Sequence, residues 1–210
     1  MDDDPLHSRP TRIGIFGGSF NPVHKGHTAL AQYICDEGLA DEVWFMVSPH
    51  NPLKEETELA DENLRLEMVR LAVQDHPQLR ASDFEFHLPH PSYTYITLQK
   101  LKDAFPDKAF SLIIGSDNWN LFPRWRNSDF ILQHYPIIVY PRQGETNLPH
   151  ERQEAVSSAN FKKPIFLQDA PLFPISSTEI RQAIRRKEDV SEWVDKVVIE
   201  LIRKKRLYRK

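Results

Sequence analysis

Short apolar runs bounded by turn residues alternate along this chain with amphipathic helical patterns. Nearly continuous apolar runs are typical of strands that are buried on both faces of a parallel sheet. Parallel neighbours in turn require crossover helices between them. The runs lie at residues 12–17, 42–47, 110–114 and 136–140, with a weaker one at 164–167. This alternation predicts an α/β fold, a Rossmann-like doubly wound parallel sheet.

The segments between the runs repeat apolar residues at helical spacing. Gly38 is placed to end the first helix, and Asp61 is a favourable N-cap for the second. The predicted helices span residues 24–38, 61–75 and 94–105, followed by 177–187 and 191–206. The last two predict a C-terminal helical appendage that begins near residue 176. We expect residues 1–10 to form a disordered leader and residues 11–210 to form a single domain.

Charge and cysteine content restrict the classes of function. The 210 residues carry 27 Lys and Arg against 30 Asp and Glu, a net charge of -3, so no whole-molecule field attracts nucleic acid or an anionic membrane. The single Cys35 cannot form an internal disulfide, and neither a signal-peptide pattern nor a membrane-length apolar run is present. We therefore expect a cytoplasmic protein. The basic stretch 203–210 is interpreted as a helix end that frays into solvent, with a nucleic-acid patch as the alternative.

Glycine is scarce and concentrated. Of seven glycines, Gly14, Gly17, Gly18 and Gly26 lie at or just behind the first apolar run, and Gly115 follows another run. Glycine allows a close approach to the backbone. Ligands of doubly wound sheets bind at the carboxyl ends of the strands, where the strand order reverses. These glycines therefore predict a ligand site at that edge.

The first glycine-rich turn leads into a helix that carries His24 and His27. Residues three apart face the same side of a helix, and a helix N-terminus offers free N–H groups to an anion. A catalytic zinc site needs a third protein ligand, for which His50 is the only nearby candidate. The pair therefore favours a phosphate over a metal, although capping or packing of the helix is the alternative reading.

A second constellation precedes the fourth predicted helix. Ser176, Ser177 and Thr178 are consecutive hydroxyl residues, and Arg181 follows about one turn into the helix. Hydroxyls, free N–H groups and a guanidinium could converge on one polyphosphate. Ser176 and Glu179 also fit the capping box S-x-x-E, so a well-capped helix without a ligand is the alternative.

Residues 17–27 and 175–181 together resemble the HxGH and ISSTxxR signatures of the adenylyltransferase superfamily. Within it, the chain is most similar to the bacterial nicotinate-nucleotide adenylyltransferases. The likeness extends to residues 48–54, 91–95, 114–118 and Trp125, and so spans nearly the whole chain. Asn21 departs from the pattern, because many members carry Asp there.

The resemblance implies adenylyl transfer from ATP to nicotinate mononucleotide, giving nicotinate adenine dinucleotide and pyrophosphate, with Mg²⁺ carried on the ATP phosphates. It implies small-molecule partners and leaves the oligomeric state open, a homodimer being one option. One alternative is a sister enzyme acting on nicotinamide mononucleotide or phosphopantetheine. Another is a nucleotide sensor without turnover, to which Asn21 gives some weight.

The resemblance also assigns the site residues. The catalytic residues would be His24, His27 and Arg181. The ATP-binding residues would be Ile15, Phe16, Gly17, Gly18, Ser19, Gly26, Gly115, Ser116, Asp117, Ser176, Ser177 and Thr178. The substrate-binding residues would be Asn21, Lys54, Thr94, Trp125 and Arg142. Outside this resemblance, a lone tryptophan is more often in a core and a loop Lys or Arg is more often solvated.

Overall fold

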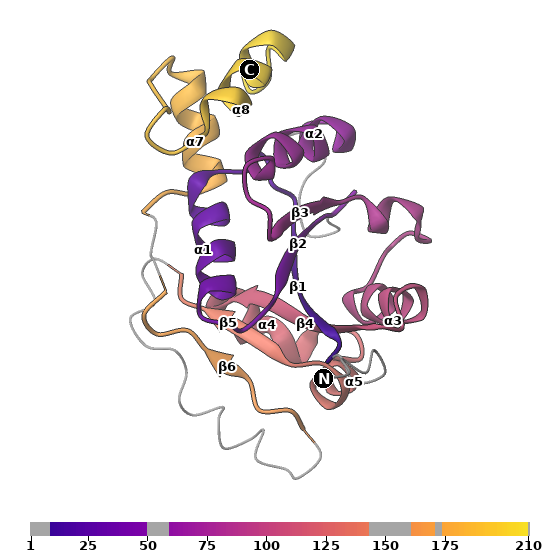
Figure 1. Cartoon of the computed structure of the whole chain (residues 1–210). Helices are drawn as coiled ribbons and strands as arrows, with labels where there is room; N and C mark the ends of the chain where they lie inside the picture. Colours follow the sequence, from indigo (N-terminus) through magenta and orange to yellow (C-terminus); the bar gives the residue numbers. More distant parts are fainter. Residues whose placement is uncertain (1–8, 50–58, 143–160, 171–173, 210) are drawn as a thin grey trace, which may run out of the picture.

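The computed structural model describes residues 9–49, 59–142, 161–170 and 174–209, and in them the chain forms one six-stranded sheet (Figure 1). All strand pairs are parallel, and the order is β3-β2-β1-β4-β5-β6. The strands are β1 (Thr11–Gly18), β2 (Glu42–Val47), β3 (Leu79–Ser82), β4 (Lys108–Gly115), β5 (Ile137–Tyr140) and β6 (Ile165–Phe166). The predicted doubly wound parallel sheet is confirmed.

The strand order reverses at β1, which pairs with β2 on one side and with β4 on the other. Successive strands therefore move outward in opposite directions from the β1/β4 junction. The carboxyl ends of these two strands are Gly18 and Gly115. This is the edge of the sheet where ligands of doubly wound folds bind.

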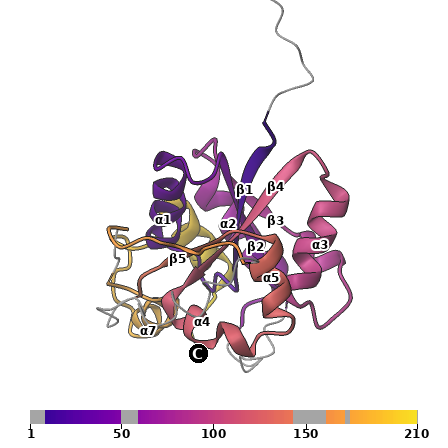
Figure 2. The ribbon, with the colours of Figure 1, turned by 90° about the horizontal axis from the view of Figure 1, so that it is seen from below.

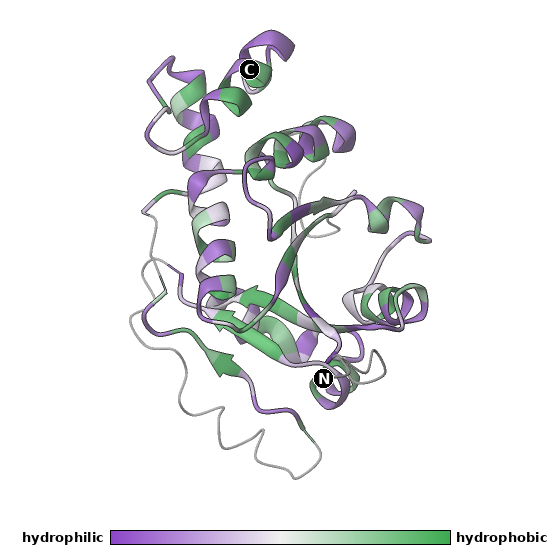
Figure 3. Ribbon diagram, in the orientation of Figure 1, coloured by the Kyte–Doolittle hydropathy of each residue, from purple (hydrophilic) through white to green (hydrophobic). Residues whose placement is uncertain are grey.

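Helices cover both faces of the sheet, and Figure 2 shows α1 on one side with α3 and α5 on the other. They are α1 (Lys25–Asp36), α2 (Glu62–Val73), η3 (Phe84–His87), α3 (Thr94–Ala104), α4 (Ser116–Leu121), η4 (Phe122–Arg124), α5 (Ser128–His134), α7 (Ser177–Arg185) and α8 (Lys196–Lys205). Phe16, Phe45 and Ile113 face α1, α2 and the C-terminal helices, whereas Ile15 and Leu112 face α3, α4 and α5. The largely apolar β4 and β5 lie between these two layers (Figure 3).

Gly14 has a packing role within the sheet. A Cβ atom at this position would lie 2.7 Å from Cδ1 of Ile113, on the neighbouring strand β4. Only glycine leaves room for that side chain. Close packing with β4 is therefore one reason for the glycines near β1, and the predicted ligand site is the other.

Several short elements were absent from the sequence prediction. The edge strand β3 has a single fully buried residue, Leu79, so it lacks the apolar run that marks the other strands. The helices α4 and α5 are 6 and 7 residues long, too short to show a helical stripe. The prediction of one helix over 191–206 is wrong at its start. The Ser191 N–H and hydroxyl both bind the Asp189 carboxylate in a turn, and α8 begins only at Lys196.

The end of the chain turns back onto the protein. Arg206 and Tyr208 have left-handed backbone, with φ of 55° and 60°, and the Leu207 N–H donates to the Ile202 carbonyl at 3.0 Å. Leu207 and Tyr208 then pack against the core that lies between the sheet and α1, α2 and the C-terminal helices. The expectation that this stretch frays into solvent is wrong for these two residues. Most of the predicted leader lies outside the described residues.

Within the described ranges, none of the helices is long and apolar enough to cross a membrane.

Candidate active site

The glycine-rich turn and the start of α7 meet in space. Arg181 Nη1 donates to the Asn21 carbonyl at 2.9 Å, and the Ser177 hydroxyl donates to the Pro22 carbonyl at 2.9 Å. Figure 1 shows α7 next to the first turn of α1, at the carboxyl-end edge of β1. The two segments are about 155 residues apart in sequence, so their contact depends on the fold.

The two histidines lie together at the start of α1. His24 is the N-cap, the ring centroids of His24 and His27 are 3.6 Å apart, and the ring planes are inclined by 30°. The His24 backbone N–H donates to Nδ1 of His27 at 3.2 Å. In a neutral His27 the proton is therefore on Nε2, which makes that atom a donor. The predicted common face of the pair is confirmed.

His24 is neutral in this environment. Its exposed fraction is 5%, and burial, with a smaller contribution from the positive charge of Arg142, lowers the pKa of His24 to about 4. Arg142, which follows β5, also lies at the carboxyl-end edge of the sheet, because its backbone N–H donates to the Ser116 hydroxyl just after β4. Without a ligand, the His24 imidazole can therefore act as a hydrogen-bonding group but not as a cation.

The low pKa of His24 predicts an acid-sensitive fold. Between pH 6.5 and 4 the unfolded chain binds a proton at this position that the folded chain does not, so stability decreases as the pH falls through this window. At pH 5 the expected loss is about 2 kcal/mol relative to pH 7.5. Urea denaturation at both pH values tests this expectation. His24→Gln should remove this part of the loss and the exposed-site control His134→Gln should retain it; equal pH dependence in both would contradict the assignment.

The corner after β4 supports Arg142. The Ser116 hydroxyl is fully buried and accepts the Arg142 backbone N–H at 3.0 Å, and the Asp117 carboxylate lies 3.5 Å from Arg142 Nε. A Cβ atom at Gly115 would collide with this carboxylate and lie 2.9 Å from the same Nε. Gly115 is thus needed for the Asp117–Arg142 pair. The buried side chain of Ser116 holds this corner and has no exposed surface for a ligand.

The hydroxyl cluster caps α7. The Ser176 hydroxyl accepts the Glu179 N–H and donates to the Glu179 carboxylate, which confirms the predicted capping box. The Thr178 hydroxyl accepts from Nη2 of Arg181 at 3.3 Å. Arg181 is only 8% exposed. Thr178, which follows the cap residue in the first turn of α7, therefore helps to orient the Arg181 guanidinium.

Exposed backbone at the end of β1 is confined to its last residues. Ile15 and Phe16 are buried on opposite faces of the sheet, whereas Gly17 is exposed and has open space where a side chain would be. The Gly18 carbonyl accepts the Ser48 N–H at 3.0 Å, and Ser19 is half-buried. Gly26, in the first turn of α1, is also half-buried. The glycine turn thus presents backbone beside the histidines.

Arg65 was not predicted from the sequence. It is 1% exposed, and its guanidinium donates to four backbone carbonyls. The acceptors are Ser19 and Ser48 at 2.8 Å and Pro49 and Ala60 at 2.9 Å. Arg65 therefore joins the turn after β1 to the loop after β2. A signal was present, because residue 65 shares the stripe of Met68, Val69 and Ala72 on α2, where an arginine is unusual.

Asn21 points into the protein. It is 2% exposed, and its Oδ1 accepts the Tyr208 hydroxyl at 2.7 Å and the Ala60 N–H at 3.2 Å. Tyr208 is a second residue that the sequence reasoning missed, since the basic tail gave no sign of it. In this structure Oδ1 of Asn21 is used within the protein.

The segments that carry Thr94 and Trp125 lie close together. The Arg126 guanidinium is 4.9 Å from the centre of the Tyr93 ring, and these two residues are direct neighbours of Trp125 and Thr94. Thr94 opens α3, and Trp125 is half-buried with its ring 5.4 Å from that of Phe122. The structure thus brings these two predicted substrate residues into one region. Lys54 and His50 lie outside the described residues.

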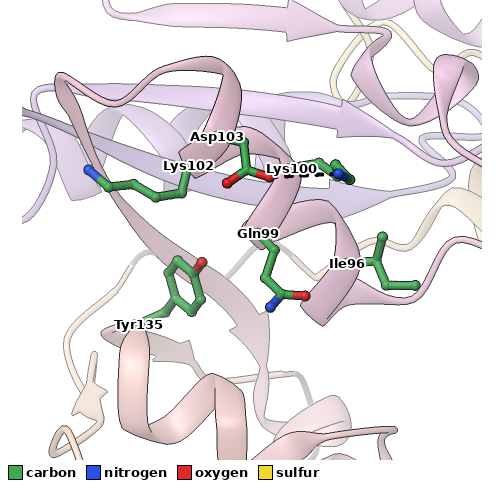
Figure 4. Close-up of a pocket in the computed structure, with 6 residues that line it drawn as sticks. All are labelled: Ile96, Gln99, Lys100, Lys102, Asp103 and Tyr135. Carbon is green, nitrogen blue, oxygen red and sulfur yellow. Dashed lines mark ion pairs between the residues drawn. The ribbon is translucent and has the colours of Figure 1, made fainter.

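Neither a metal cluster nor the hollow in Figure 4 identifies another site. Among the described residues, no group of three or more His, Cys, Asp or Glu side chains could hold a metal ion. The hollow is lined by Ile96, Gln99, Lys100, Lys102, Asp103 and Tyr135. Tyr135 comes two residues before β5, so this hollow lies at the amino-terminal edge of the sheet, opposite the histidines. The donors at the carboxyl-end edge are imidazoles, guanidinium groups and N–H groups, which suit phosphates.

Comparisons with known proteins agree with this geometry. The model of the cytidylyltransferase-like family matches residues 15–183. A probable nicotinate-nucleotide adenylyltransferase of Bacteroides thetaiotaomicron is 50% identical over 196 residues, 93% of each chain. One of Bacteroides fragilis is 48% identical over 193 residues, 91% of each chain.

Solved structures show the same fold at lower identity. A Plasmodium falciparum nicotinic acid mononucleotide adenylyltransferase complexed with NaAD is 20% identical with a TM-score of 0.76, covering 94% of this chain and 97% of that one. A putative nicotinate-nucleotide adenylyltransferase of Vibrio parahaemolyticus is 22% identical with a TM-score of 0.69, covering 95% of this chain and 96% of that one.

Proposed function

The chain belongs to the cytidylyltransferase-like family, in which it groups with the nicotinate-nucleotide adenylyltransferases, and from this premise we propose that it transfers the adenylyl group of ATP to nicotinate mononucleotide. The products are nicotinate adenine dinucleotide and pyrophosphate, so the enzyme acts in NAD biosynthesis. The observation that carries the proposal is the hydrogen bond from Arg181 to the Asn21 carbonyl, because it joins the two signature segments in one site.

The chemistry needs little more than alignment of charge. An oxygen of the mononucleotide 5′-phosphate forms a bond to the α-phosphorus of ATP, and the bond from that phosphorus to the bridging oxygen breaks. The bonding electron pair leaves with pyrophosphate. Because the nucleophile is already an anion, a strong general base is unnecessary. Catalysis consists of holding two polyanions in line and stabilising the charge that develops between them.

The site residues divide this work by position. His27 and His24 bind the α-phosphate. Nε2 of His27 is a donor, and the ring centroids of the two histidines are 3.6 Å apart. Arg181 and the N-terminus of α7 attract the β- and γ-phosphates, and Gly17 leaves the backbone open to the nucleotide. The negative charge of a bound triphosphate favours the cationic form of His24 and so raises the pKa of this imidazole.

Mg²⁺ enters as part of the substrate, bound to the ATP phosphates, where it neutralises charge. Within the described residues the site offers few carboxylates, so an ion carried by the nucleotide suits it better than a dedicated cage.

The nicotinate ring would stack on Trp125, and its carboxylate would approach the N-terminus of α3 at Thr94. We place the reaction in the cytoplasm, where a chain with one free, buried cysteine is stable. One domain over residues 11–210 remains a prediction, and the oligomeric state stays open, with a homodimer as one option.

The acceptor is tested by pyrophosphate release. Purified protein with ATP and Mg²⁺ is offered nicotinate mononucleotide, nicotinamide mononucleotide or phosphopantetheine in separate reactions. We expect release with nicotinate mononucleotide at a kcat/KM at least about tenfold above the other two, because a carboxylate site leaves its donors unpaired when a carboxamide binds. Preference for another acceptor would favour the sister enzyme. Release with none, while ATP still binds, would favour the nucleotide sensor.

A further inference from the structure

The last described residues of the chain contact the candidate active site from outside it. After α8, left-handed backbone at Arg206 and Tyr208 turns the chain back, and Tyr208 packs against the core to which α1, α2 and the C-terminal helices contribute. Its hydroxyl donates to Oδ1 of Asn21 at 2.7 Å, across 187 residues of sequence. Asn21 lies in the turn that leads to His24.

The hydroxyl of Tyr208 keeps its proton and can therefore act as a hydrogen-bond donor. Burial raises the pKa of Tyr208, although the nearby cations Arg181 and Arg65 oppose this shift, so the phenol stays protonated at physiological pH. Oδ1 of Asn21 accepts a second hydrogen bond, from the Ala60 N–H at 3.2 Å. Two donors on one oxygen determine the orientation of the amide, since its NH₂ end could not accept either bond.

The backbone of Asn21 connects its side chain to the candidate active site. Its carbonyl accepts from Arg181 Nη1, and the next carbonyl, that of Pro22, accepts from the Ser177 hydroxyl. Two residues further on, the His24 N–H binds Nδ1 of His27. The side chain of Asn21 is thus held by Tyr208 while its peptide is held by α7.

We propose that Tyr208 is a positioning residue for adenylyl transfer, acting through Asn21 on the turn between β1 and α1. It touches neither substrate in this scheme, and the proposal rests on the function proposed above. Tyr208 keeps the turn in the one arrangement in which Arg181 and the histidines face the same triphosphate. A displacement of about 1 Å in such a constellation reduces rates strongly.

The test is Tyr208→Phe, which removes the hydroxyl and keeps the ring. We expect kcat/KM for ATP to fall about fivefold to tenfold, the equivalent of one lost hydrogen bond, with the melting temperature close to that of the wild type. The matched control is Tyr33→Phe. Tyr33 packs against the same core, and its hydroxyl makes no hydrogen bond to the part of the chain described here, so its rate should be unchanged.

A double-mutant cycle separates the hydrogen bond from packing. In an Asn21→Ala background the hydroxyl has lost its acceptor, so Tyr208→Phe should cause no further loss. Additive losses would overturn the proposal, as would a Tyr208→Phe rate within twofold of the wild type. If Asn21→Ala does not fold, Asn21→Leu, which has a similar shape and no hydrogen-bond acceptor, serves as the background.

A readout without substrate keeps this inference separate from the enzyme assignment. The Lys25 N–H donates to the Trp193 carbonyl at 2.8 Å, which joins the start of α1 to the appendage. In ligand-free Tyr208→Phe we expect this amide and that of His24 to exchange hydrogen at least about fivefold faster, with no change in Tyr33→Phe. Unchanged exchange would overturn the positioning role. If the wild type turns over no acceptor, the proposed function fails, whereas the exchange result still decides the role of Tyr208 in the turn.

Discussion

We expect His27→Ala to lower kcat by at least about a hundredfold and to change KM for ATP by less than about threefold. In the proposed mechanism the Nε2 donor of His27 stabilises charge that develops mainly in the transition state, and the loss of one such donor typically costs a factor of 10² to 10³. Steady-state pyrophosphate release, measured with nicotinate mononucleotide as acceptor, gives both constants. His27 also packs beside Phe20, with 5.2 Å between the ring centroids, so the melting temperature is measured in parallel.

The control for this variant is His134→Ala, at an exposed position at the end of α5. Its kcat should equal that of the wild type within experimental error. His27→Gln keeps an N–H donor near the position of Nε2 and should recover part of the lost rate. A folded His27→Ala enzyme with a kcat within tenfold of the wild type would remove His27 from the catalytic residues.

We expect Arg65→Met to lower the free energy of unfolding by about 3–5 kcal/mol. Methionine replaces the apolar stem of the side chain but leaves the carbonyls of Ser19, Ser48, Pro49 and Ala60 buried without their common donor. Against an ordinary stability of about 5–15 kcal/mol, this loss brings a domain close to unfolding at room temperature. Urea denaturation at pH 7 measures the difference.

The matched control is Arg70→Met, which makes the same substitution on the same helix. Arg70 is 59% exposed on its side chain and pairs with the exposed Asp83 at 3.4 Å, so its loss should cost less than about 1 kcal/mol. The destabilisation by Arg65→Lys should lie between those of Arg65→Met and Arg70→Met, because one ammonium cannot reach four separate carbonyls. Equal destabilisation by Arg65→Met and Arg70→Met would mean that the carbonyl cluster around Arg65 adds no stability.

Local patterns in the sequence predict most of the fold because each depends on neighbours within one element. The runs over β1, β2, β4 and β5 are nearly continuous in apolar residues, since both faces of these strands are covered. The caps Asp61 and Ser176 bind N–H groups only a few residues away, as predicted. The short edge strand β3 lacks such a pattern, because it is recognised only by its pairing with β2.

In the candidate site, too, the features that depend on neighbouring residues could be predicted and the long-range contacts could not. The common face of His24 and His27 and the Ser176–Glu179 capping box follow from helical spacing, so they could be predicted. Which carbonyl Arg181 binds could not be predicted from spacing.

The sequence by itself determined the alternation of strands and helices, the caps, and the chemistry of the two signature segments, because residues a few positions apart decide these features. Only the tertiary structure decided that Arg65 joins two loops and that Tyr208 binds Asn21. These contacts join segments far apart in the chain. Their partners are backbone carbonyls and an amide, groups that the residue pattern does not distinguish until the layers are packed.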